Sequence, residues 1–89
     1  MNRRDNISQT EIKLYTTLGC HLCEQALAMF DYLCQHNPDI NNRYTIKLVE
    51  ISESDNLVEE YGIRIPVLAK SNSELAWPFE FEELQVWLK

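Results

Sequence analysis

The alternation of apolar and polar residues predicts the first elements of a small α/β domain. Residues 11–17, "EIKLYTT", begin with strict alternation and are rich in strand-forming residues, which predicts a strand. From Cys23 the apolar residues recur at helical spacings, and the pattern predicts an amphipathic helix. The residue before Pro38 avoids helical geometry, so we expect this helix to end at Gln35 or His36.

The rest of the chain extends this pattern. Residues 43–52, "RYTIKLVEIS", read as a mostly buried second strand, and the long crossover before it permits a parallel, right-handed β-α-β unit. The remaining predictions are a short helix within residues 52–62, a hairpin of strands within residues 63–70 and 74–77, and a last helix within residues 78–89. The order is β-α-β-α-β-β-α. Residues 1–10 are predicted to be a flexible lead-in to one domain over residues 11–89.

The amino-acid composition argues against some classes of function. The 89 residues carry 14 acidic and 8 basic side chains, a net charge of −6, and the basic residues are scattered along the chain. Phosphate backbones would be repelled, so we expect no nucleic-acid partner. The apolar stretches are too short to cross a bilayer, and no apolar segment follows the arginines near the N-terminus, so we expect neither membrane insertion nor export.

The cysteines are expected to have a chemical role rather than to form a permanent structural disulfide. Three cysteines without a secretory signal suggest a reducing cytoplasm, where a close pair is expected to be catalytic or metal-binding. Cys20 falls in the turn and Cys23 in the first turn of the helix. The helix dipole and the unpaired N–H groups at a helix start favour thiolate over thiol, which makes Cys20 the candidate nucleophile. Cys23 can then attack a mixed disulfide on Cys20 and resolve it.

Other interpretations of the cysteines are open. The pair could simply be two small buried side chains, or it could form part of a zinc site with Cys34 and His36. About 16 Å of helix rise between Cys23 and Cys34 argues against one tetrahedral site. We expect Cys34 to pack in the core and His36 to lie at the helix C-terminus, where its charge suits the dipole. A protonated His21 would favour the Cys20 thiolate further, whereas a neutral one would do little.

Taken together, these segments resemble a glutaredoxin. The match comprises "LYTTLGCHLC" after a strand, "RIPVL" at residues 64–68, and a closing hairpin and helix, and it covers residues 11–89. The resemblance implies a thioredoxin-like fold with a four-stranded mixed sheet flanked by helices. It also implies that Ile65-Pro66 is a cis peptide facing the cysteines and that the backbone before Pro66 pairs with a bound peptide or with glutathione. The implied substrate-binding residues are Ile65, Pro66, His21 and Leu22.

Three positions depart from the usual glutaredoxin pattern. Typical members have a lysine or arginine three residues before the first cysteine, an aromatic residue between the cysteines, and a Gly-Gly pair followed by Asp near the last helix. Here Thr17, Leu22 and "SELAWPFEFEE" stand at those places. The usual anchors for the glutathione carboxylates are therefore missing, and the pattern is similar to a set of small bacterial glutaredoxin-like proteins.

The resemblance predicts a cytoplasmic thiol-disulfide oxidoreductase that acts through Cys20-His21-Leu22-Cys23. It requires no bound cofactor, takes a protein or low-molecular-weight disulfide as substrate, and receives electrons from glutathione or a thioredoxin-type reductant. Two alternatives are a non-catalytic module that binds a protein along the Pro66 edge and a glutathione-assisted carrier of a [2Fe-2S] cluster shared by two chains. Arg64 is expected to be solvated or to meet an anionic substrate group. The aromatic residues near the C-terminus are expected to be mostly core residues: Trp77, Phe79, Phe81 and Trp87.

Overall fold

The computed structural model describes residues 9–89. Residues 1–8 of the predicted lead-in lie outside this range, and Thr10 already belongs to the first strand. The elements are β1 (Thr10–Thr16), α1 (His21–His36), α2 (Pro38–Arg43), β2 (Tyr44–Glu50), the 3₁₀ turn η2 (Ile51–Glu53), α3 (Asp55–Tyr61), β3 (Val67–Lys70), β4 (Ser73–Ala76) and α4 (Phe81–Trp87). No helix among the described residues is long and apolar enough to cross a membrane.

The four strands form one mixed sheet in the order β2-β1-β3-β4. β1 and β2 are parallel, as the crossover predicts, with Leu14 opposite Leu48. β3 runs antiparallel to β1, with Leu14 also opposite Leu68, and it forms a hairpin with β4. The predicted α/β fold with a four-stranded mixed sheet is therefore confirmed.

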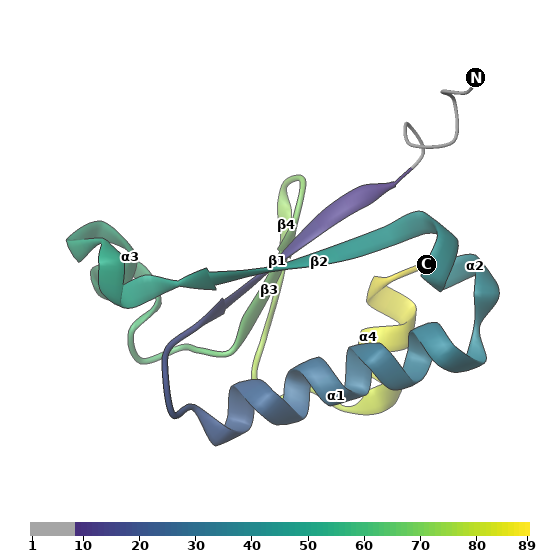
Figure 1. The fold of residues 1–89 in the computed structure, drawn as a ribbon, viewed down its shortest axis with the longest axis horizontal. Helices are drawn as coiled ribbons and strands as arrows, with labels where there is room; N and C mark the ends of the chain where they lie inside the picture. Colours follow the sequence, from purple (N-terminus) through teal and green to yellow (C-terminus); the bar gives the residue numbers. More distant parts are fainter. Residues whose placement is uncertain (1–8) are drawn as a thin grey trace.

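One face of the sheet carries the main core. Figure 1 shows α1 and α4 on the same side of the sheet, with α1 running along its length. Ile12 and Leu14 of β1 and Leu68 of β3 point to this side and pack with buried residues of both helices. Those residues of the helices are Ala26, Phe30, Leu33 and Leu84, joined by Leu88 just beyond α4. The C-terminal aromatic residues join this core as expected: Phe79 is buried, and Trp77, Phe81 and Trp87 pack against it.

A smaller cluster occupies the opposite face. Because side chains alternate along a strand, Tyr15 and Val67 point away from Leu14 and Leu68. Val67 packs there with Ile51 and with Tyr61, the last residue of α3, while Tyr15 is partly buried against the same group. This cluster connects α3 to the end of the sheet from which β1 leads into α1.

Two local predictions differ from the structure. Pro38 is predicted only to end the first helix, but α2 begins at Pro38 because the Asn37 side chain accepts hydrogen bonds from the backbone N–H groups of Asp39 and Ile40. The third strand begins at Val67 rather than at residue 63, and residues 62–66 form a loop.

Candidate active site

A tight turn brings Cys20 to the start of α1. The Cys20 N–H donates to the Thr17 carbonyl at 3.2 Å, which closes a four-residue turn. Gly19, the third residue of that turn, has a φ of 79°, a left-handed conformation that a side chain would strain. Leu18 occupies the tip of the turn and is 92% exposed. The turn therefore fixes the position of Cys20 and leaves an apolar side chain in solvent beside it.

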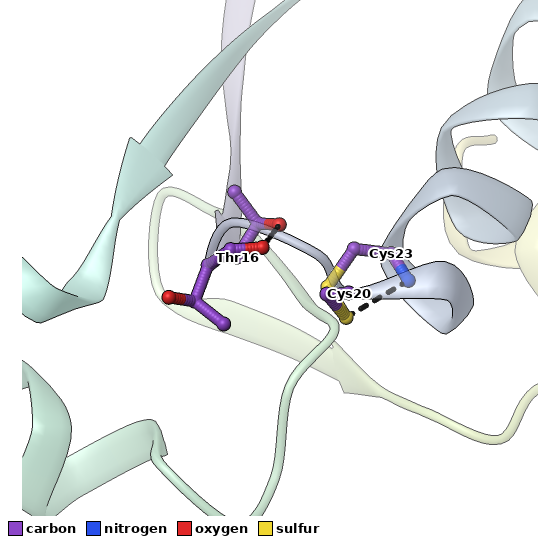
Figure 2. Close-up of a disulfide and its surroundings, with 4 residues drawn as sticks. Thr16, Cys20 and Cys23 are labelled. Carbon is purple, nitrogen blue, oxygen red and sulfur yellow. Dashed lines mark hydrogen bonds between the residues drawn. A yellow bond between two sulfur atoms is a disulfide. The ribbon is translucent and has the colours of Figure 1, made fainter.

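Cys20 is the N-cap residue of α1, and Cys23 lies in the first turn of the helix. The Cys23 N–H donates to the Cys20 sulfur at 3.1 Å, drawn as a dashed line in Figure 2. The two sulfurs form a disulfide, with the Cα atoms 5.2 Å apart. A sulfur that accepts from a helix N-terminus is well placed to carry negative charge when the bond is reduced.

The two cysteines differ in exposure. Cys20 is half-buried, whereas Cys23 is only 4% exposed because it lies on the buried side of α1. An incoming disulfide can therefore reach the Cys20 sulfur more readily than the Cys23 sulfur. His21 and Leu22, between them, are both exposed on the first turn of the helix.

Pro66 lies at the same end of the sheet as the cysteines. Tyr15 of β1 pairs with Val67 of β3, so Pro66 and Thr16 are the next residues along two antiparallel strands. Four residues after Thr16 the chain reaches Cys20. The Ile65-Pro66 bond is cis, and Trp77-Pro78 is a second cis bond. Pro66 is fully buried, and its carbonyl accepts a hydrogen bond from the Trp77 N–H at 3.0 Å.

A polar cluster holds the loop before Pro66. Tyr61 stacks on Tyr15 with ring centroids 3.9 Å apart, and its hydroxyl donates to the Glu74 carboxylate at 2.8 Å. Arg64 donates to the other oxygen of the same carboxylate at 2.7 Å, and it pairs more weakly with Glu60. The N–H groups of Arg64 and Ile65 both donate to the Tyr61 carbonyl. Arg64 is partly solvated, as the sequence predicts, and its ion pairs also anchor the loop.

The anchoring cluster shifts the pKa values of its members. Hydrogen bonds from Tyr61 and Arg64 hold the pKa of Glu74 below its ordinary value. Burial, followed by the bond to Glu74, raises the pKa of the Tyr61 phenol. Both shifts favour an ionised Glu74 that accepts from a protonated Tyr61.

A groove lies beside the disulfide, between the start of α1 and the end of β2. Its volume is about 360 Å³, and Cys20 and Cys23 form part of its wall. We call it the α1–β2 groove; the other lining residues used below are Thr17, Leu18, Glu24, Leu27, Leu48 and Glu50. The sequence analysis names only the cysteines and Thr17 among these. The carboxyl ends of β1 and β2 meet here, so their parallel pairing is the signal that could have revealed the others.

Cys34 stands apart from this site. It lies near the C-terminal end of α1, half-buried against the main core, which agrees with the prediction of a packing role. Burial, with a smaller contribution from the Asp31 carboxylate, raises the pKa of the Cys34 thiol. His36 is the basic residue in the last turn of α1, where the sequence analysis places it.

The sheet, its helices and the position of the cysteine pair define the class of protein: a thioredoxin-like fold with a C-x-x-C disulfide at the start of its first helix. A family model described as "Glutaredoxin-like domain (DUF836)" matches residues 11–89. The chain belongs to this glutaredoxin-like family, and the resemblance noted in the sequence is confirmed.

Solved structures agree with this assignment. The chain is 35% identical to the structural genomics target protein XcR50 from X. campestris, whose X-ray structure superposes with a TM-score of 0.69. The similarity covers 86% of this chain and 93% of that one. No curated protein matches the chain. The family and the Cys20–Cys23 pair at disulfide distance indicate a redox-type role.

Proposed function

We propose that this protein is a thiol-disulfide oxidoreductase of glutaredoxin-like type. The observation that carries the proposal is Cys20 at the N-cap of α1, where its sulfur accepts the Cys23 N–H and where the residue is less buried than Cys23. This asymmetry suits a nucleophile that meets the substrate and a second thiol that stays inside.

The proposed cycle begins with both cysteines reduced. The Cys20 thiolate attacks one sulfur of the substrate disulfide, an S–S bond forms between them, and the other substrate sulfur leaves as a thiolate that takes up a proton. Cys23 then loses its proton and attacks the Cys20 sulfur, which releases the second substrate thiol. Two electrons have passed to the substrate, and a dithiol or glutathione must reduce the Cys20–Cys23 bond before the next turnover.

The residues around the cysteines are proposed to dock the substrate. His21 and Leu22 are exposed on the first turn of α1, next to the attacking sulfur. Pro66 is the last residue of the loop formed by residues 62–66, and it lies at the same end of the sheet as the cysteines. The Ile65 N–H already bonds to Tyr61, so the docking role proposed for Ile65 falls on its carbonyl group. A cycling cysteine pair needs a reducing pool, which is why we propose the cytoplasm as the compartment.

Disulfide reduction by cysteine variants tests the proposal. Pre-reduced wild type should reduce a peptide disulfide and become oxidised at Cys20–Cys23. Cys20→Ser should lose this reaction, and Cys23→Ser should accumulate a mixed disulfide on Cys20, detectable by mass spectrometry. Cys34→Ser is the matched control and should retain the activity. Unchanged turnover in Cys20→Ser would overturn the proposal.

The binding-module alternative gives a different result. A Cys20→Ser/Cys23→Ser double variant that captured a protein partner as well as the wild type would favour binding without turnover. Loss of capture would favour covalent exchange.

A further inference from the structure

The α1–β2 groove lies on the opposite side of β1 from the Pro66 loop. β1 has β2 on one side and β3 on the other, and the groove follows the β2 side whereas Pro66 precedes β3. If a substrate segment docks along the Pro66 loop, the groove therefore stays free. Substrate residues on the other side of the attacked cysteine can then enter it. A volume of about 360 Å³ is enough for one or two side chains.

The groove combines an apolar wall with two carboxylates. Leu18 and Leu48 remain 92% and 54% exposed although they line a groove beside the disulfide, and Leu27, which also lines the groove, is partly buried. Exposed apolar side chains at a functional site mark a place where a partner docks. An apolar side chain of a substrate would cover all three leucines.

The charged side chains that line the groove are all acidic. Glu24 and Glu50 both line it, and within residues 9–89 no lysine, arginine or histidine does. Hydrogen bonds, first from Thr17 and then from Ser52, hold the pKa of Glu50 below its ordinary value, so this carboxylate is charged at neutral pH. The protein as a whole carries a net charge of −6. An anionic ligand such as glutathione would be repelled here, and a cationic side chain would be attracted.

We propose that the α1–β2 groove is a specificity site that selects protein disulfides whose attacked cysteine is followed or preceded by an apolar residue and a lysine or arginine. The apolar residue covers Leu18 and Leu48, and the cation lies between Glu24 and Glu50. This inference rests on the proposed oxidoreductase function, and it names the class of substrate that function would serve.

Matched peptide disulfides test the inference. Two homodimeric peptides differ only in a Lys or a Glu two residues from the cysteine, and both carry a leucine next to it. Pre-reduced protein is mixed with each, and the second-order rate constant is divided by the one for dithiothreitol, which removes differences in intrinsic reactivity. Each exposed charge pair contributes about a two- to fivefold effect, so two carboxylates should favour the Lys peptide about tenfold at low salt. The preference should shrink at high salt because these charges are exposed.

Variants identify the source of the preference. Glu24→Gln and Glu50→Gln should each lower it about two- to fivefold, and replacing the peptide leucine by serine should slow the reaction for wild type. Glu11→Gln is the matched control, since it removes the same charge from the far end of β1, about 16 Å along the strand from Thr16. It should leave the preference unchanged.

The outcomes separate the two proposals. Equal rates for the Lys and Glu peptides, or a Lys preference that is as large in both groove variants as in the wild type, would overturn the specificity site and leave the oxidoreductase function standing. Failure of reduced wild type to reduce either peptide would overturn the oxidoreductase function and the specificity site with it.

Discussion

The hydroxyl of Tyr61 is predicted to stabilise the loop that presents Pro66, and Tyr61→Phe removes only that hydroxyl. The ring would still stack on Tyr15, but the 2.8 Å bond to Glu74 would be lost. A hydrogen bond to a charged group contributes about 1.5–3 kcal/mol when it is shielded from water. The Glu74 side chain is 39% exposed, so water replaces part of this and we expect a cost of about 1 kcal/mol. For a domain of this size, a loss of about 1 kcal/mol lowers Tm by about 4–8 °C.

The stability that Tyr61→Phe loses should be larger at neutral pH than at acidic pH. The folded pKa of Glu74 lies below its ordinary value of 4.5, so the bond stabilises the fold above that pH and the contribution is lost as the pH falls through the folded pKa. Urea unfolding at pH 7 and pH 3 measures this directly. Tyr61→Phe should be less costly at pH 3, while Tyr32→Phe, on an exposed tyrosine, should cost little at either pH. An equal cost for Tyr61→Phe at both pH values, or no cost at pH 7, would show that the bond to Glu74 does not stabilise the fold.

Two further predictions concern other parts of the molecule. Tyr44→Phe removes a buried 2.6 Å bond to the Leu88 carbonyl and should lower the free energy of unfolding by about 1–3 kcal/mol in urea titrations, whereas unchanged stability would show that the carbonyl finds another partner. In the reduced protein at pH 7, iodoacetamide should alkylate Cys20 before Cys34, because burial and Asp31 raise the pKa of Cys34 and keep its thiolate scarce. Peptide mapping by mass spectrometry measures the order, and faster labelling of Cys34 would contradict it.

Local patterns in the sequence predict most of the fold. The alternation before residue 17 and the helical spacing after Cys23 each reflect one face of an element against the core, so β1 and α1 appear nearly at their observed bounds. The prediction lacks α2 because a proline after Asn37 is compatible both with the end of one helix and with the start of the next. β3 starts late because the N–H groups of residues 64 and 65 donate to the Tyr61 carbonyl and form a turn after α3. The apolar pattern of residues 63–68 does not distinguish this turn from a strand.

The residues of the candidate site also fall into two groups: those that local spacing predicts and those that only contacts between distant segments bring together. Cys20 and Cys23 are adjacent on one helix turn, so spacing alone places both sulfurs together. Glu50 and Leu48 reach the disulfide only through the pairing of β2 with β1, and Arg64 meets Glu74 only through the hairpin. Local sequence patterns do not predict contacts between distant segments. Those contacts form both the α1–β2 groove and the polar cluster that anchors the Pro66 loop.

The central claim is that Cys20 and Cys23 form a reversible redox couple. The most direct measurement is a redox titration of Cys34→Ser in dithiol buffers, with thiol labelling and mass spectrometry at each potential and with glutathione and a thioredoxin reductase system compared as electron donors. A reversible couple should give a single two-electron transition, in which the potential changes by about 30 mV for each tenfold change in the oxidised-to-reduced ratio. Both cysteines should be labelled below the midpoint potential and neither above it. If Cys20 and Cys23 stayed fully labelled at every potential, they would not form a redox couple.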